Sequence, residues 1–254
     1  MFQYAFSKFL ESIGKTDVVL EFGFYQYIQQ QGGDSIREPL LDRFHCEYRT
    51  PEEPMPVPGH IVTEGELMQG IFLDDVIFIG DWQDRELVCR SEELLRRDFR
   101  LRNEYITPEL QTLAEEMLKD EHSVSVHIRR TDYLNPDNRE KYVQLEAGYY
   151  VNALNTIADR IGKKPTVYLF SDDPAGAVRM IGNSCGDICA VEGNAAYQDL
   201  YLMTMAHHSI IANSTFSWWG SFLRERRDGI TVVPKRWFRH RPDYMLYAET
   251  DIRL

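Results

Sequence analysis

The sequence predicts an α/β fold with a parallel sheet in its second half. From Ser123 to Val233, short apolar runs rich in branched residues alternate with longer segments of helical periodicity. This alternation is typical of βαβ units, whose strands run parallel. The first half is irregular and loop-rich, and the composition, 43% hydrophobic and 27% charged, can support a core. We therefore predict two domains, 1–119 and 120–254.

The regular elements of the first half are few. Residues 1–13 place apolar side chains at helical spacing before Gly14, which suits a helix end. Ser91 and Thr107 are small hydroxyl residues in front of helical patterns, as N-caps are. In chain order, we expect helices at 1–13, 91–101 and 108–118, strands at 17–24 and 76–79, and a proline-dense loop at 50–59.

The second half is regular by comparison. Its apolar runs are short and end in polar residues, whereas its helical segments carry an apolar stripe. We expect strands at 123–128, 166–170, 188–191, 209–212 and 230–233, and helices at 147–161, 175–181, 196–206 and 216–226.

Polar segments follow three of these strands. They are residues 127–132, 171–174 and 213–215. Open parallel sheets bind ligands at the carboxyl ends of their strands. The three segments therefore predict one binding site at one edge of the sheet.

The segment His127-Ile128-Arg129-Arg130-Thr131-Asp132 suits a phosphate site. Guanidinium groups bind phosphate oxygens through paired N–H donors, so Arg129 or Arg130 fits a diphosphate. His127 and Asp132 would fix the arginine or the loop. The alternative is two solvated arginines beside a loop aspartate, and the residues alone leave both interpretations open.

The other two segments each have two interpretations as well. Asn213, Ser214 and Thr215 precede a helix, where backbone N–H groups and hydroxyls bind anions or cap the helix. Asp172 and Asp173 follow a strand. A carboxylate there can accept two hydrogen bonds from guanine, whereas one of the pair is expected to be an N-cap.

Two tryptophans are adjacent in the last predicted helix. Trp218 and Trp219 point about 100° apart on a helix. Both cannot face one apolar stripe, so we expect only one of them to pack against the sheet.

Charge and cysteine content exclude several classes of partner. The net charge of -12 predicts no nucleic acid or anionic-membrane partner, although a few arginines can reverse the field inside a cleft. We expect no metal site, because adjacent His207 and His208 diverge on a helix and the cysteines form no ligand pattern. The cysteines are expected to be reduced, Cys46, Cys89, Cys185 and Cys189. We also expect no signal peptide and no transmembrane segment.

Several of these motifs occur together in one known family. HIRRTDYL, FSDDP, DLYLMTMAHHSIIANSTFSWWGSFL and the opening MFQYAFSKFL with IGDWQDREL resemble the bacterial α-1,2-fucosyltransferases. The resemblance implies a GT-B fold, with two Rossmann-like domains and the donor on the C-terminal parallel sheet. It implies inverting transfer of L-fucose from GDP-β-L-fucose to the 2-hydroxyl of a galactose-terminated glycan or oligosaccharide, with no metal or other cofactor.

The resemblance also implies roles for residues of this chain. Arg129 would contact the diphosphate and stabilise the leaving charge, Asp172 or Asp173 would read guanine, and Ser214, Thr215 and Phe216 would lie by the phosphates. His127, Arg130 and Asn213 complete the predicted donor site. For the general base, Asp132 and Asp137 stay open, beside a dissociative route without a strong base.

The resemblance has one departure. Family members usually carry a strand and a Gly-rich loop, roughly GGLGNQ, just before MFQYA, whereas this chain begins at that methionine. Either the true start lies upstream or the chain was truncated. Transfer of another GDP-sugar, and a non-catalytic GDP-sugar- or glycan-binding role, remain as alternatives. We expect a cytoplasmic protein, or one peripheral on the inner face of a bacterial membrane.

Overall fold

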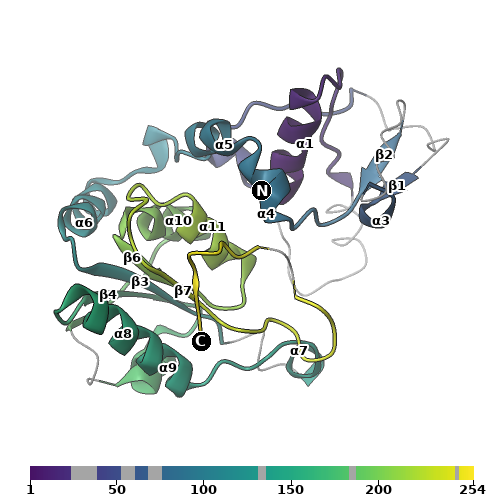
Figure 1. Ribbon diagram of the computed structural model, residues 1–254. Coiled ribbons are helices and arrows are strands. Elements are labelled where there is room, and N and C mark those ends of the chain that lie inside the picture. The colour runs from purple at the N-terminus through teal and green to yellow at the C-terminus, as the bar shows by residue number, and fades with distance from the viewer. Residues whose placement is uncertain (24–38, 53–60, 68–75, 131–135, 183–186, 244–245) are drawn as a thin grey trace. The chain divides into compact units, whose positions relative to one another are not determined.

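The computed structural model divides into two compact units, Met1–Arg100 and Leu101–Leu254 (Figure 1). It describes residues 1–23, 39–52, 61–67, 76–130, 136–182, 187–243 and 246–254. Each unit is treated by itself below. Within the described ranges, every helix is too short or too polar to span a bilayer.

The first unit contains a two-stranded parallel sheet and short helices. Its elements are α1 (Phe2–Ser12), η1 (Leu41–Arg43), β1 (Ile61–Thr63), α3 (Glu64–Leu67), β2 (Ile77–Ile79), α4 (Arg85–Cys89) and α5 (Glu92–Asp98). The predicted helix 1–13 and strand 76–79 are thereby confirmed. Phe6 of α1 stacks on Trp82 with ring centroids 3.9 Å apart. Tyr4 donates a 2.6 Å hydrogen bond to Asp98, so α1 is also tied to α5.

The predicted strand 17–24 is wrong for residues 17–23, and Phe24 lies outside the described residues. Asp17 has a positive φ of 59°, and among the described residues only Leu20 N–H of this stretch donates to a backbone carbonyl of another segment, that of Arg49. Branched residues favour a strand only where a partner strand receives them. Of the predicted loop 50–59, residues 50–52 are irregular and the rest lies outside the description.

The second unit is built on a six-stranded, fully parallel sheet of order β5-β4-β3-β6-β7-β8. Its elements are η2 (Asn103–Tyr105), α6 (Pro108–Lys119), β3 (Ser123–Ile128), α7 (Pro136–Lys141), α8 (Ala147–Ile161), β4 (Thr166–Ser171), α9 (Pro174–Ile181), β5 (Asp187–Ala190), α10 (Ala196–Met205), β6 (His208–Ile210), α11 (Thr215–Phe222), β7 (Thr231–Val233) and β8 (Ile252–Arg253). The predicted α/β class with a parallel sheet is confirmed.

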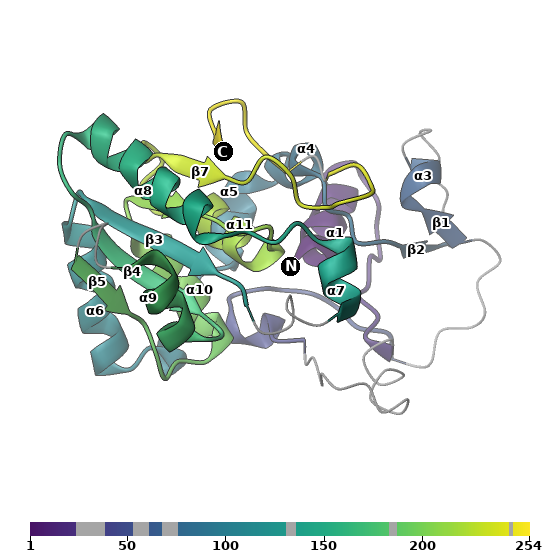
Figure 2. The same cartoon turned by 90° about the horizontal axis from the view of Figure 1, so that it is seen from below.

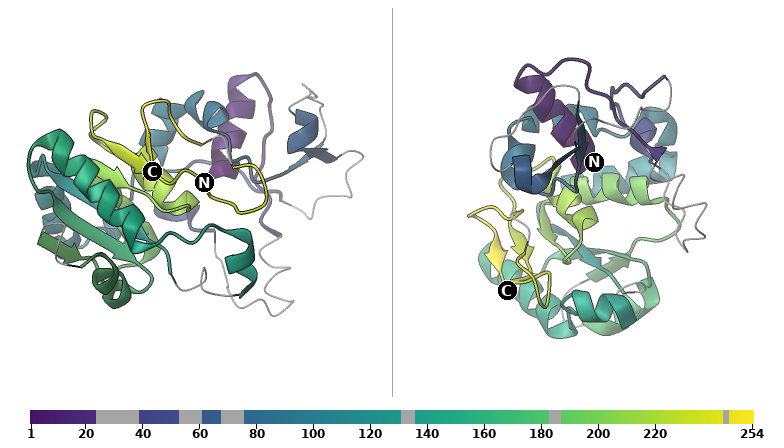
Figure 3. Two further views of the ribbon diagram at one scale, coloured as in Figure 1. Left: turned by 60° about the horizontal axis from the view of Figure 1, so that its bottom comes forward. Right: turned by 90° about the vertical axis from the view of Figure 1, so that its right-hand side faces the viewer.

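Helices cover both faces of this sheet. Helices α8 and α9 pack on one face, and α10 and α11 lie on the other (Figures 1 and 2). Strand β3 is buried throughout because successive side chains face opposite helix layers. Val124, Val126 and Ile128 join the core under α8 and α9, whereas His127 meets α11. The yellow C-terminal segment returns to the edge of the sheet as β8 (Figure 3).

The division between the units differs from the predicted boundary at 119/120. Helix α6 belongs to the second unit, in which it packs against α10. The amphipathic pattern of α6 predicts a helix with one apolar face, but it does not indicate which neighbouring elements that face packs against. Strand β8 was not expected either, because two residues are too few for a periodic signal.

Both adjacent tryptophans of α11 are buried, although only one of them was expected to pack against the sheet. Trp218 and Trp219 are exposed by only 4% and 2%. Trp218 donates its indole N–H to the carbonyl of Leu246 at 2.7 Å and stacks on Phe222. Gly220 lets α10 approach, because a Cβ there would lie 2.8 Å from Met203 Cβ. Helix α11 is therefore enclosed on several sides and buries more than one stripe.

Candidate functional site

Two ion pairs join the ends of β3 and β4. The strands are in register with Ile128 opposite Ser171, so the residues that follow come level with one another. Arg129 Nε lies 3.5 Å from Asp172 Oδ2, and Arg130 Nε lies 3.0 Å from Asp173 Oδ2. Two cations and two carboxylates, 43 residues apart in the chain, thus meet at the carboxyl edge of the sheet.

The arginines are held differently. Arg130 donates its backbone N–H to Asp172 at 2.8 Å, and its guanidinium also contacts Met180 Sδ at 3.6 Å. It is therefore fixed against α9. Arg129 Nε lies 3.5 Å from its carboxylate, a distance longer than a good hydrogen bond, and its side chain is a third exposed. Of the two, Arg129 is better placed to turn to an anionic ligand.

Asp173 is the N-cap of α9. Its Oδ1 accepts the backbone N–H of Gly176 at 3.0 Å, and its own N–H donates to Ser171 Oγ. The hydrogen bond from Gly176, followed by that from Arg130, lowers the pKa of the Asp173 carboxyl. One of the two aspartates was expected to be a cap, and the structure identifies it.

The two roles of Asp173 can be separated by mutation. Asp173→Ala removes the cap and the ion pair, and we expect it to lower Tm by roughly 2–4 °C. Asp173→Asn keeps an oxygen for Gly176 N–H, so its effect should be smaller. Thermal unfolding followed by circular dichroism measures both, with the exposed Asp159→Ala on α8 as control. Equal Tm values for Asp173→Ala and the control would contradict the capping role.

Helix α11 directs its N-terminus toward the same edge. Ser214 is the N-cap with extended backbone, and its hydroxyl makes no capping bond in the described structure. The first N–H groups of a helix lack intrahelical acceptors and attract anions. Phe216 lies against His127, with ring centroids 5.5 Å apart, which links this helix start to β3. The structure thus brings Ser214, Thr215 and Phe216 to the edge that carries Arg129.

Asn213 is a structural tie between segments. Its side chain is 1% exposed, and its amide nitrogen donates to the carbonyls of Val143 at 2.9 Å and Trp237 at 3.1 Å. Val143 N–H in turn donates to the Trp237 carbonyl. The predicted donor-site residue therefore holds together the segments after α7 and β7.

The candidate bases are only partly described. Asp132 lies outside the described residues, and Asp137 lies in α7 with only its backbone described. Lys141, at the end of α7, accepts the N–H of Arg239 at 3.0 Å. The end of the helix that carries Asp137 is thus anchored close to Asn213.

Asp199 is a carboxylate that the sequence interpretation passed over. It lies in the first turn of α10, which follows the carboxyl end of β5. Burial raises its pKa to about 6, although a 3.1 Å hydrogen bond from Asn194 opposes the shift. The available signal was an acidic residue at the start of an otherwise apolar helix.

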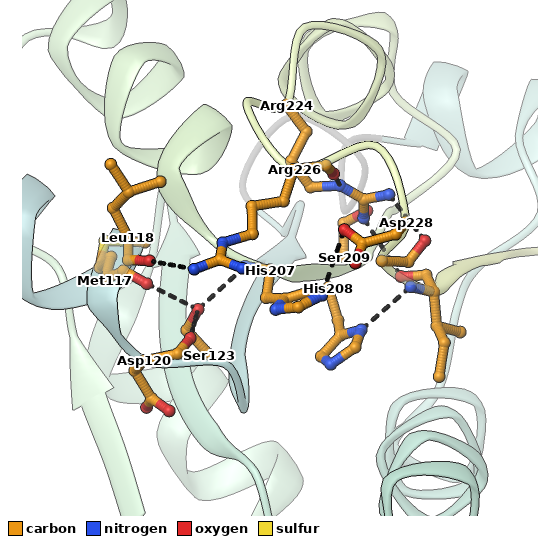
Figure 4. Close-up of polar contacts among 12 residues, drawn as sticks. Met117, Leu118, Asp120, Ser123, His207, His208, Ser209, Arg224, Arg226 and Asp228 are labelled. Carbon is orange, nitrogen blue, oxygen red and sulfur yellow. Dashed lines mark hydrogen bonds and ion pairs between the residues drawn. The ribbon is translucent and has the colours of Figure 1, made fainter.

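His207 and His208 lie at the opposite, amino edge of the sheet (Figure 4). Their rings stack with centroids 4.5 Å apart, and His208 Nδ1 accepts the backbone N–H of Ile230 at 3.0 Å. Among the described residues, no group of three or more His, Cys, Asp or Glu could hold a metal ion. The expectation that these two side chains diverge on a helix is wrong, because α10 ends at Met205 and His208 begins β6.

This histidine makes stability depend on pH. Burial and neighbouring His207 lower the pKa of His208 from 6.5 to about 4. Below pH 6.5 the unfolded chain binds a proton that the folded chain does not, so stability should fall from about pH 6.5 to about pH 4. His208→Gln should reduce the Tm loss between neutral pH and pH 5 by several degrees, while exposed His45→Gln should not. An unchanged pH dependence in His208→Gln would contradict this.

The sequence matches one protein-family model over most of the second unit. Residues 89–245 match the model described as glycosyl transferase family 11. The chain belongs to this family. The matched range contains all the predicted site residues, from His127 to Phe216.

Named members of the family resemble the chain over part of their length. An α-1,2-colitosyltransferase of Escherichia coli is 33% identical over 67% of this chain and 59% of its own. The O-antigen biosynthesis glycosyltransferase WbnK of Escherichia coli is 30% identical over 62% of this chain and 53% of its own. The mouse galactoside α-(1,2)-fucosyltransferase 2 is 31% identical over 39% of this chain and 30% of its own. The chain thus spans little more than half of the bacterial relatives.

Solved structures with similar parts have low overall similarity. POFUT1 in complex with GDP-fucose has 12% identity and a TM-score of 0.40, covering 62% of this chain and 54% of POFUT1. The fucosyltransferase NodZ from Bradyrhizobium has 20% identity and a TM-score of 0.37, covering 59% and 52%. The expected GT-B arrangement of two facing domains stays a prediction for this family 11 chain.

Proposed function

We propose that this family 11 glycosyltransferase transfers L-fucose from GDP-β-L-fucose to the 2-hydroxyl of a galactoside, with inversion. The observation that carries the proposal is the pair of arginine–aspartate contacts beside the start of α11. Arginine forks and a helix N-terminus together suit a diphosphate. The acceptor is proposed as a galactose-terminated glycan or oligosaccharide.

The residues of this edge would act on the leaving group. As the acceptor hydroxyl attacks fucose C1, the bond from C1 to the diphosphate oxygen breaks, and negative charge grows on GDP. Arg129 and the first N–H groups of α11 would stabilise that charge. Asp172 would keep Arg129 oriented until the phosphates arrive, and is the remaining candidate for guanine recognition.

The acceptor proton needs a destination. Asp132 and Asp137 remain the proposed alternatives, and a dissociative route without a strong base is the third. Asp199, with a pKa near 6, is a further carboxylate at the carboxyl edge. Single Asp→Asn variants compared by kcat at saturating donor would separate these options.

A second donor is favoured by one observation. The chain is 33% identical to an α-1,2-colitosyltransferase, so a GDP-linked colitose is a rival to GDP-fucose. Both donors would use the same diphosphate contacts. A panel of GDP-sugars with one galactoside acceptor identifies the preferred sugar by kcat/KM.

The decisive assay measures GDP release. Purified protein, and a longer form extended upstream, would be incubated with GDP-fucose and lactose or other galactosides. Acceptor-dependent GDP release supports the proposal, and EDTA should leave the rate unchanged because we propose metal-independent transfer. Strong inhibition by EDTA would instead support a metal-dependent transferase. GDP binding without release in either form would support a non-catalytic role.

We propose a cytoplasmic location. Three cysteines, Cys46, Cys89 and Cys189, form no disulfide within the described residues. Free thiols are typical of a reducing compartment such as the cytoplasm. Fractionation of cells that express the tagged chain tests this.

A further inference from the structure

The segment after β7 carries basic side chains in an otherwise acidic chain. The net charge of the whole chain is -12, yet no acidic residue lies between Asp228 and Asp243. Four exposed cations fall in this interval, Lys235, Arg236, Arg239 and Arg241. We refer to residues 235–241 as the basic segment. The local field there opposes that of the chain as a whole.

The backbone of the basic segment is anchored. Trp237 and Phe238 are 3% and 2% exposed, and Asp243 Oδ1 accepts both of their N–H groups, at 2.6 and 3.0 Å. Arg239 N–H donates to the carbonyl of Lys141 at 3.0 Å. The yellow segment accordingly lies beside α7 (Figure 2). The aromatic residues thus fix the chain from inside, while the cations remain on the surface.

Neighbouring charges leave this face positive. Exposed Lys141 adjoins the segment, and exposed Arg253 lies on β8 next to β7. The acids of the adjoining segments are Asp137, Glu140, Asp243, Glu249 and Asp251, and α7 adds the cation Arg139. Of these, Asp243 and Asp251 accept backbone N–H groups. Seven cations therefore stand against five acids in these segments, and two of the acids are engaged with the backbone.

We propose that the basic segment is a docking surface for an anionic lipid bilayer. Its cations are exposed along a run of chain, whereas a single phosphate would need donors converging from the interior. Clusters of four or more Lys and Arg are typical of attraction to anionic headgroups. The Debye length is about 8 Å at physiological ionic strength, so acids on distant faces are screened. The net charge, which argued against a membrane partner, is thus overcome locally.

The position of the segment gives docking a consequence for the proposed function. Strand β7 is parallel to β3, so the basic segment begins at the carboxyl edge that carries Arg129 and Asp172. A docked bilayer would lie on the side of the candidate donor site. The acceptor class that suits this geometry is a glycan attached to a membrane lipid. This acceptor assignment rests on the proposed function, whereas bilayer binding does not.

Vesicle sedimentation tests the docking surface. The protein should sediment with vesicles rich in phosphatidylglycerol, stay in solution with pure phosphatidylcholine, and be released by high salt. The combined variant Lys235→Gln, Arg236→Gln, Arg239→Gln should lower the partition coefficient by about 100-fold, since each cation contributes roughly fivefold. Wild-type affinity in this variant, or equal binding to neutral vesicles, would overturn the proposal.

A matched variant changes the net charge equally at the other edge. Arg160→Gln, Lys163→Gln, Lys164→Gln neutralises three exposed cations at the end of α8, and should bind like the wild type. An equal loss in both variants would assign binding to net charge and overturn the proposal. So would loss of transfer to a soluble galactoside with unchanged vesicle binding, because the segment would then belong to the substrate site. Wild-type vesicle binding without any transferase activity would contradict the proposed function and leave the docking surface supported.

Discussion

Arg129→Ala is expected to abolish sugar transfer while the fold survives. The side chain is a third exposed and follows the last residue of β3, outside the apolar core, so its loss should leave the fold intact. If Arg129 stabilises the leaving diphosphate, transfer should fall by roughly 100- to 1,000-fold. Arg129→Lys keeps the positive charge but loses the paired N–H donors of the guanidinium, so its transfer rate should lie between those of the wild type and Arg129→Ala. GDP release and circular dichroism measure activity and fold on the same samples.

The comparison needs a cation outside the site. Arg160 is exposed on α8, and Arg160→Ala should retain the wild-type rate. Near-normal turnover in Arg129→Ala would remove the assignment of this edge as the donor site. A higher KM at unchanged kcat would place Arg129 in ground-state binding and not in leaving-group stabilisation.

Arg224→Ala is expected to lower the free energy of unfolding more than the substitutions at Asp173, His208 or Arg226 do. The side chain is 5% exposed, and its guanidinium donates to the carbonyls of Arg226, Gly229 and Ile230 and to Ser209 Oγ, at 2.8 to 3.2 Å (Figure 4). Truncation leaves buried acceptors without a donor, each costing about 1–3 kcal/mol. A total of roughly 3 kcal/mol would lower Tm by about 6–12 °C in a chain of this size.

A neighbouring arginine supplies the control for Arg224. Arg226 donates one hydrogen bond of 3.4 Å to the Leu118 carbonyl, so Arg226→Ala should cost less than about 1 kcal/mol. Differential scanning calorimetry compares the two variants. Equal Tm values would mean that water replaces the guanidinium of Arg224 without penalty.

Arg224 also explains where helix prediction failed. The pattern of 216–226 predicted one helix, but α11 ends at Phe222. The turn is made by a side chain that binds carbonyls up to six residues ahead, which periodicity does not encode. By contrast, helix 147–161 is confirmed to the residue, since its apolar stripe packs directly on the sheet and a left-handed Gly162 ends it.

The candidate site was likewise predictable in part: its location followed from the sequence, whereas its contacts did not. Strand endings were enough to predict that the described residues of 127–132 share one edge with 171–174 and 213–215, because parallel strands fix that geometry. The pairing of each arginine with its aspartate depends on strand register, which no motif states. The amide of Asn213 contacts carbonyls 70 and 24 residues away, so only the folded chain shows that it is a tie.

The register that aligns the ends of β3 and β4 also limits where insertions and deletions could be tolerated in this family. The two arginines and two aspartates face each other because Ile128 is paired with Ser171. Insertions in the turn between α8 and β4 leave that pairing intact, whereas a single deletion inside either strand would shift every partner by one position and reverse the inward faces. Length variation during evolution should therefore collect in the connections and spare the strands.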